Sequence, residues 1–169
     1  MATNLFMKID GIDGQSSDSL HKGWIEIEGF TFGAHNNNRM GDSYYPQLTT
    51  SSSQATPVTV SKAMDNSSTE ICKRVLEGTE VKKIELVSCV MQQGKVTDHA
   101  KIELEKCSIT SCNFAVDAGD GHIYESVVIS YGKVTIAVTP LKDKDGKACG
   151  KAVMDYDFIE NKTSAAAGG

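Results

Sequence analysis

Hydrophobic and polar positions alternate along most of the chain, and this alternation predicts β-strands. Successive side chains of a strand point to opposite faces, so each alternating segment has one apolar face and one polar face. The clearest alternating or apolar segments are residues 6–9, 24–32, 58–62, 82–92, 100–114, 123–138 and 152–159. Seven or eight strands with one helix favour a mainly β fold, either a small antiparallel β-barrel or a two-sheet sandwich.

The alternation changes phase at Gly29. Ile25 and Ile27 are the apolar positions before this glycine, whereas Phe30 and Phe32 are the apolar positions after it. A bulge or a sharp bend at Gly29 would return both pairs of side chains to one core.

One short flanking helix is predicted over residues 67–77. Ser67 and Glu70 have the spacing of a capping box, in which the serine oxygen accepts from a free helix amide. Apolar residues then recur at helical spacing, and Gly78 stands where a helix often ends on a left-handed residue.

Residues 34–57 have few apolar positions and predict a long extended loop. Half of them are Ser, Thr, Asn or Gln, and Tyr44-Tyr45-Pro46 is the bulky cluster. A connection of this length is usually either functional or disordered, and composition leaves both open. Because aromatic residues and arginine are enriched at protein interfaces, Arg39, Tyr44 and Tyr45 are candidate interface residues.

The length of 169 residues indicates one domain, over residues 1–161, with a small polar tail at 162–169 that we expect to be disordered. A net charge of −5 without a basic block argues against nucleic-acid binding. The chain has no apolar run of the roughly 20 residues that span a bilayer, and its first residues lack the pattern of a signal peptide. We therefore expect no membrane insertion.

Candidate chemistry is sparse. Five cysteines without CxxC spacing indicate free and mostly buried thiols in a reducing compartment, although a Cys107–Cys112 pair stays open. The four histidines lack metal-ligand spacing, which favours surface or turn positions. They are His21, His35, His99 and His122. Since no nucleophile, acid–base or phosphate motif stands out, we expect no catalytic residue, no cofactor, no metal and no enzyme activity.

Other polar and aromatic residues have structural interpretations. Asp117 with Asp120, and Asp143 with Asp145, lack the twelve-residue calcium-loop register and are interpreted as hairpin turns. Trp24, the sole tryptophan, is interpreted as a packing residue.

Four sequence blocks follow one another in a specific order. They are Phe6-x-Lys8-Ile9 with Gly14-Gln15-Ser16-x-Asp18-x-x-His21, Trp24-Ile25-Glu26 leading to Phe30-Thr31-Phe32-Gly33, Val60-Ser61-Lys62-x-x-Asp65-x-Ser67-Ser68, and Glu125-Ser126-Val127-x-Ile129-x-Tyr131-Gly132-Lys133-Val134. In order and spacing they resemble Hcp, the haemolysin co-regulated protein family of the bacterial type VI secretion system.

The resemblance implies a β-barrel subunit that forms a homohexameric ring. Rings would stack into a tube that is expelled inside a contractile sheath behind a VgrG-type spike, with effector proteins in the lumen. The protein would wait in the bacterial cytoplasm and then be secreted without a signal peptide. The loop at 34–57, with Arg39, Tyr44 and Tyr45, would reach the neighbouring ring, and Thr31 would face the lumen.

Three other functions remain as alternatives. A phage tail-tube-like protein would share the barrel and the ring. A small-ligand or glycan-binding β-sandwich would be a monomer or dimer with Tyr44 and Tyr45 as an aromatic platform. A small enzyme would need a perturbed acid or thiol in a pocket.

Overall fold

The computed structural model of the chain describes residues 3–39, 49–92, 94–116, 118–119, 121–140 and 150–163. Within these residues it contains eleven strands and one helix, so the fold is mainly β as predicted. The strands are β1 (Thr3–Ile9), β2 (Ile25–Ile27), β3 (Gly29–Thr31), β4 (Ala34–Arg39), β5 (Thr49–Ala55), β6 (Val58–Ala63), β7 (Glu80–Gln92), β8 (Lys95–Val116), β9 (Ile123–Ser130), β10 (Lys133–Val138) and β11 (Ala152–Asp157). The helix α1 spans Ser67–Glu77.

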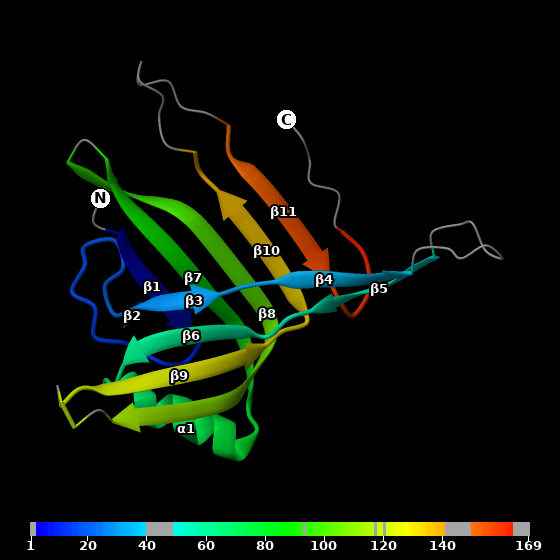
Figure 1. Ribbon diagram of the computed structural model, residues 1–169. Coiled ribbons are helices and arrows are strands. Elements are labelled where there is room, and N and C mark those ends of the chain that lie inside the picture. The colour runs from blue at the N-terminus through cyan, green and yellow to red at the C-terminus, as the bar shows by residue number, and fades with distance from the viewer. Residues whose placement is uncertain are drawn as a thin grey trace.

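Most strands belong to one curled antiparallel sheet in the order β2-β1-β7-β8-β9-β6-β3 (Figure 1). β10 pairs with β8, and β11 pairs with β10. The chain passes from one end of this sheet to the other at Glu28, whose N–H donates to the carbonyl of Ser61 at 2.8 Å. The sheet thus curls like a barrel, although no ladder in the described strands joins β2 to β3.

The bend between β2 and β3 confirms the expectation drawn from the phase change. Ile25 and Ile27 are buried, and Phe30 and Phe32 pack against the same core from the other side of the bend. Gly29 pairs with Ser61 of β6, so the chain leaves one ladder and joins another within three residues. This exchange of partners is why one run of sequence has two hydrophobic phases.

The prediction of one continuous strand over residues 123–138 was wrong, because the segment divides into β9 and β10. Tyr131 and Gly132 separate the two strands, and the N–H of Gly132 donates to the carbonyls of Glu105 and Lys106. A Cβ on Gly132 would lie 2.8 Å from Cδ1 of Ile159, so a larger residue at this crossing would require the exposed side chain of Ile159 to move. β9 pairs with the second half of β8, and β10 pairs with the first half.

In the segment 34–57, residues 34–39 and 49–55 form strands, which corrects the expectation of an extended loop for these residues. β4 and β5 form a two-stranded hairpin that projects from the body of the molecule (Figure 1). Side chains join the strands, as where Nε2 of His35 lies 3.0 Å from Oε1 of Gln54. Cross-strand backbone bonds satisfy such strands without an apolar core, so their composition carried no signal of alternation.

The helix prediction is confirmed at both ends, but the predicted capping box is wrong. Gly78 adopts the left-handed conformation after the last turn, with φ of 64°. At the start, the carboxylate of Asp65 accepts the N–H of Ser67 at 2.9 Å. The N–H of Asp65 in turn donates to Oγ of Ser68 at 3.0 Å. Asp65 therefore accepts from Ser67 and donates to Ser68, so the side chains that satisfy the first turn are those of Asp65 and Ser68 rather than those of Ser67 and Glu70.

Candidate assembly surfaces

One side of the sheet carries hydroxyl and amide side chains and no exposed charge. It comprises the outward positions of β3, β6, β9 and of β8 from Ser108 onward. Its polar members are Thr31, Thr59, Ser61, Ser108, Thr110, Ser111, Asn113, Ser126 and Ser130. We call this surface the hydroxyl face.

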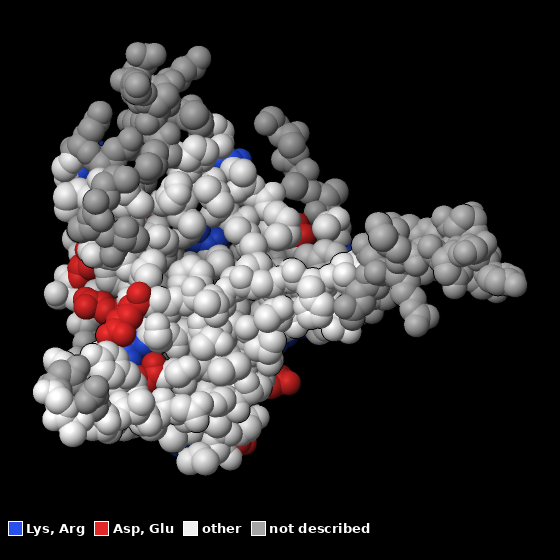
Figure 2. All heavy atoms as spheres, in the orientation of Figure 1, with Lys and Arg blue, Asp and Glu red and all other residues white. Residues whose placement is uncertain are grey.

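The charged residues of those strand segments are Lys62 and Glu125, and both are buried. In Figure 2 the surface over the middle of β3 and β6 and over the described part of the hairpin is white, whereas red and blue spheres lie at the left ends of these two strands. An uncharged polar surface can form many weak hydrogen bonds, but it does not select a partner by charge.

The other half of the sheet carries a ladder of opposite charges. Lys83 and Glu85 of β7 lie beside Lys101 and Glu103 of β8, with four nitrogen–oxygen distances between 2.7 and 3.3 Å. We call these four residues the charge ladder. Partial burial opposes ionisation of Lys101, but its bonds to Glu103 and Glu85 raise its pKa overall. Partial burial of Glu103 acts against ionisation too, and the two lysines lower its pKa below the ordinary value.

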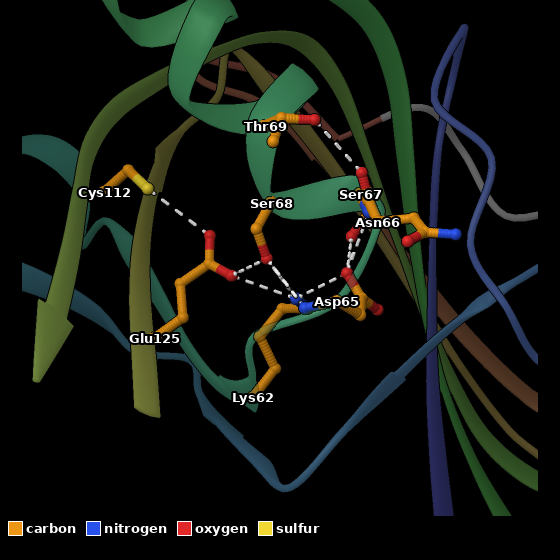
Figure 3. Close-up of polar contacts among 8 residues, drawn as sticks. All are labelled: Lys62, Asp65, Asn66, Ser67, Ser68, Thr69, Cys112 and Glu125. Carbon is orange, nitrogen blue, oxygen red and sulfur yellow. Dashed lines mark hydrogen bonds and ion pairs between the residues drawn. The ribbon is translucent and has the colours of Figure 1, made fainter. Parts of the chain in front are cut away.

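A second polar cluster lies inside the fold, beneath the start of α1 (Figure 3). Nζ of Lys62 on β6 lies 2.9 Å from Oε2 of Glu125 on β9, and both side chains have no solvent exposure. The same nitrogen donates to Oδ1 of Asp65 at 2.9 Å and to Oγ of Ser68 at 3.0 Å. The thiol of Cys112 donates to Oε1 of Glu125 at 3.3 Å. We call these five residues the buried network.

The buried network fixes α1 to the sheet. Ser68 lies in the first turn of the helix, and its hydroxyl donates to Glu125. Burial opposes ionisation of Asp65, but the bonds from Ser67 and Lys62 lower its pKa. Burial and the contact with Glu125 raise the pKa of Cys112 to about 12, so this thiol remains protonated. Every charge in the network therefore has a hydrogen-bonded partner, as a buried charge requires.

The predicted assembly residues fall on two features of the fold. Thr31 is exposed at the end of β3, on the hydroxyl face, next to Thr59 of β6. Arg39 is the last residue of β4 and pairs with Thr49 across the hairpin. Tyr44 and Tyr45 lie outside the described residues. Thr31, the candidate lumen residue, and Arg39, a candidate stacking residue, therefore lie on different features of the fold.

His21 lies at the start of a turn, as predicted, but it is not at the surface, because it is only 3% exposed. Its ring stacks on Phe6, with centroids 4.6 Å apart, and meets the edge of Trp24. This contact confirms Trp24 as a packing residue. Elsewhere, His35 and His122 are exposed and lie near strand starts, as expected, whereas His99 is half-buried within β8 and not at a strand end.

The described cysteines, Cys72, Cys89, Cys107 and Cys112, are all free, which leaves the Cys107–Cys112 pair unformed. Cys89 and Cys107 are buried and the other two are half-buried. Cys149 lies outside the described residues. The same is true of the two aspartate pairs that the sequence analysis interpreted as hairpin turns, at 117–120 and 143–145. No helix of the described residues is long and apolar enough to cross a membrane.

The comparisons with known proteins place this chain among structural proteins of a bacterial secretion machine. A family model described as "Type VI secretion system effector, Hcp" matches residues 6–138. The chain belongs to the Hcp family, whose members build the tube of the type VI secretion system. A search of the curated proteins finds no match.

Solved structures agree with this assignment. One described as a type six secretion system protein is 29% identical and superposes with a TM-score of 0.87, covering 96% of this chain and 100% of its own. Hcp1 from Salmonella typhimurium is 22% identical with a TM-score of 0.77, over 97% of this chain and 100% of its own. A type VI secretion effector from Yersinia pestis is 20% identical with a TM-score of 0.70, over 90% and 98% of the two chains.

Proposed function

We propose that this protein forms homohexameric rings that stack into a tube, and that its role is assembly rather than catalysis. The tube would be expelled from the bacterial cytoplasm inside a contractile sheath, behind a VgrG-type spike, without a signal peptide. Effector proteins would travel in the lumen. The observation that carries the proposal is the division of one small subunit into a projecting hairpin and an uncharged polar face.

The hairpin is the element that suits contact between rings. It projects from the body (Figure 1), and its strands are held by their own ladder rather than by the main core. An arm of this kind can reach a neighbouring ring without disturbing the subunit that carries it. Arg39, Tyr44 and Tyr45 are the residues we assign to this contact.

The hydroxyl face is the surface that suits the lumen. A tube that carries different effectors needs weak contacts with many sequences, and neutral hydroxyl and amide groups provide them. Thr31 stands on this face and is exposed in the single subunit. Strong charges would select cargo by its charge and hold it too tightly to be released.

The first test is light scattering on the purified protein, followed by negative-stain imaging of the same fraction. We expect a mass near six chains and ring-shaped particles. A monomer with no rings at any concentration up to the millimolar range would contradict the proposal and favour a ligand-binding sandwich.

The hairpin assignment predicts a selective loss of stacking. Replacing both tyrosines, Tyr44→Ala with Tyr45→Ala, should shorten or abolish tubes in electron micrographs while the ring mass stays the same. Leu76→Ala is a matched control, because Leu76 is 81% exposed on α1, away from the hairpin. Tubes of normal length in the double variant would remove these tyrosines from the stacking contact.

The lumen assignment predicts a change in cargo without a change in assembly. Thr31→Arg places a charge on the hydroxyl face and should reduce, several-fold, the effector proteins that co-purify with rings. The mass of the ring should stay near six chains. An unchanged set and amount of co-purified proteins would contradict the lumen position of Thr31.

A further inference from the structure

Three metal-ligating side chains meet at one end of the sheet, away from the surfaces discussed above. They are His21 in the segment between β1 and β2, Cys89 on β7 and Asp98 on β8. Their ligand atoms all lie within 4.8 Å of one another. A register shift in the β7–β8 ladder pairs Cys89 directly with Asp98, which brings both side chains to the same side.

The distances approach those of a tetrahedral metal site. Nε2 of His21 lies 3.3 Å from Oδ1 of Asp98, and Sγ of Cys89 lies 3.4 Å from the same oxygen. Zinc bond lengths place tetrahedral nitrogen, oxygen and sulfur ligands about 3.4–3.6 Å from one another. Two of the three edges therefore agree to within about 0.2 Å. The third edge is still open: Sγ of Cys89 lies 3.9 Å from Nδ1 of His21, so metal binding at Nε2 requires one of these side chains to shift.

The imidazole of His21 is already oriented for a ligand. Phe6 stacks on one face of the ring and Trp24 meets it edge-on. Oδ1 of Asp18 lies 3.2 Å from Nδ1, so a proton on Nδ1 is held by this carboxylate. With the proton on Nδ1, the lone pair of Nε2 would face Oδ1 of Asp98 at 3.3 Å, and a cation between these two atoms would hold them together, whereas in the doubly protonated ring the same contact is an ion pair. Metal-bound histidines typically donate their other nitrogen to a carboxylate in this way.

We propose that His21, Cys89 and Asp98 bind a divalent transition metal ion, with Zn²⁺ as the ion that this mixed nitrogen, sulfur and oxygen set suits best. Water would occupy the fourth position, because Asp98 is 47% exposed. Asp18 is a positioning residue that holds the ring of His21. The bound ion clamps the segment before β2 onto the β7–β8 hairpin and so stabilises that end of the subunit.

Coordination releases the proton of the Cys89 thiol to solvent as the sulfur–metal bond forms. No electron is transferred, and the two positive charges of the ion offset the negative charges of the Cys89 thiolate and the Asp98 carboxylate.

The test is a titration of the purified full-length protein with cobalt(II) chloride after removal of metal with a chelator. Cobalt takes the same ligands as zinc and gives a thiolate-to-cobalt absorption band. We expect one cobalt per chain, competition by zinc chloride, and a rise in the midpoint of thermal unfolding on addition of zinc. Absence of the band in the wild-type protein at a hundred micromolar cobalt would overturn the proposal.

Variants locate the site. Cys89→Ser and Asp98→Asn should each remove the band or weaken cobalt binding at least tenfold. Asp18→Asn should weaken binding about 10–100-fold, the range for a residue that orients a ligand. Cys72→Ser is the matched control, since it removes a half-buried thiol outside the cluster. A band that survives in Cys89→Ser, or that disappears in Cys72→Ser, would contradict the assignment, and far-ultraviolet circular dichroism checks that each variant is folded.

Discussion

The buried network and the charge ladder contain the same kinds of groups in opposite surroundings. The Lys62–Glu125 pair spans 2.9 Å with neither side chain exposed. The Lys101–Glu103 pair is shorter, at 2.7 Å, but its side chains are 34% and 26% exposed. Water and salt reach the second pair and not the first. By distance alone the Lys101–Glu103 pair would be expected to contribute more to stability, but we expect the larger contribution from the Lys62–Glu125 pair.

The comparison shows that burial determines how much stability is lost when one residue of an ion pair is removed. A partly exposed lysine that loses its glutamate is solvated again, so its pair contributes little. A buried lysine that loses its glutamate remains an uncompensated charge in an apolar interior, which is strongly destabilising. The buried network also joins elements far apart in sequence, whereas the charge ladder joins neighbouring strands that the backbone already holds together.

The largest expected effect follows from breaking the buried pair. Lys62→Met leaves Glu125 buried without its cation, and we expect the free energy of unfolding to fall by about 3–5 kcal/mol. Urea unfolding measures this loss of free energy. The protein concentration must be the same for wild type and variant, because subunit assembly contributes to apparent stability. Lys133→Met is the matched control, since its nearest carboxylate, on Glu105, is 3.8 Å away and partly exposed.

A second variant separates charge from packing at the same position. Adding Glu125→Leu to Lys62→Met removes both buried charges, so the double variant should recover part of the lost stability. Losses that simply add would contradict the interpretation that an unpaired charge is the cause.

An intermediate effect is expected at the edge of the buried network. Asp65→Asn removes the charge that accepts from Lys62 and Ser67, and should lower stability at pH 7 by about 1.5–3 kcal/mol, the range for hydrogen bonds to charged groups. The pKa of Asp65 is lowered in the folded protein, so its stabilisation is present above the ordinary value of 3.8 and is lost as the pH falls through the folded pKa. Wild type and variant should therefore converge in acid.

The convergence is measured by urea unfolding from pH 7 down to the lowest pH at which the protein folds. A constant difference over that range would show that Asp65 acts through packing and not through its charge.

Sequence alone predicted the elements whose signals are local. The helix follows from apolar spacing and Gly78, and the bend at Gly29 follows from a change of phase over a few residues. The β4–β5 hairpin could not be predicted in the same way, because its strands are polar on both faces and show no alternation. Tertiary pairing, and not side-chain burial, makes these residues strands.

The polar clusters could not be predicted because their members are distant along the chain. Lys62 and Glu125 are 63 residues apart, and in an alternating strand each occupies a position that a hydrophobic residue could fill. His21 has no ligand spacing, since Cys89 lies 68 residues away and is brought close only by the strand pairing. One signal was present: Lys62 and Glu125 stand in phase with the apolar positions of β6 and β9.

The smallest expected effect is in the charge ladder, and salt distinguishes it from the buried network. Lys101→Ala should lower the free energy of unfolding by about 0.2–1 kcal/mol, because Lys83 still contacts both glutamates. At 1 M sodium chloride, where the screening length is about 3 Å, this difference should vanish while that of Lys62→Met persists. Lys82→Ala, at an exposed lysine of the same strand as Lys83, controls for the general loss of a positive charge. If salt left the effect of Lys101→Ala unchanged, its alkyl chain and not its charge would be responsible, and the contrast between the two clusters would rest on packing alone.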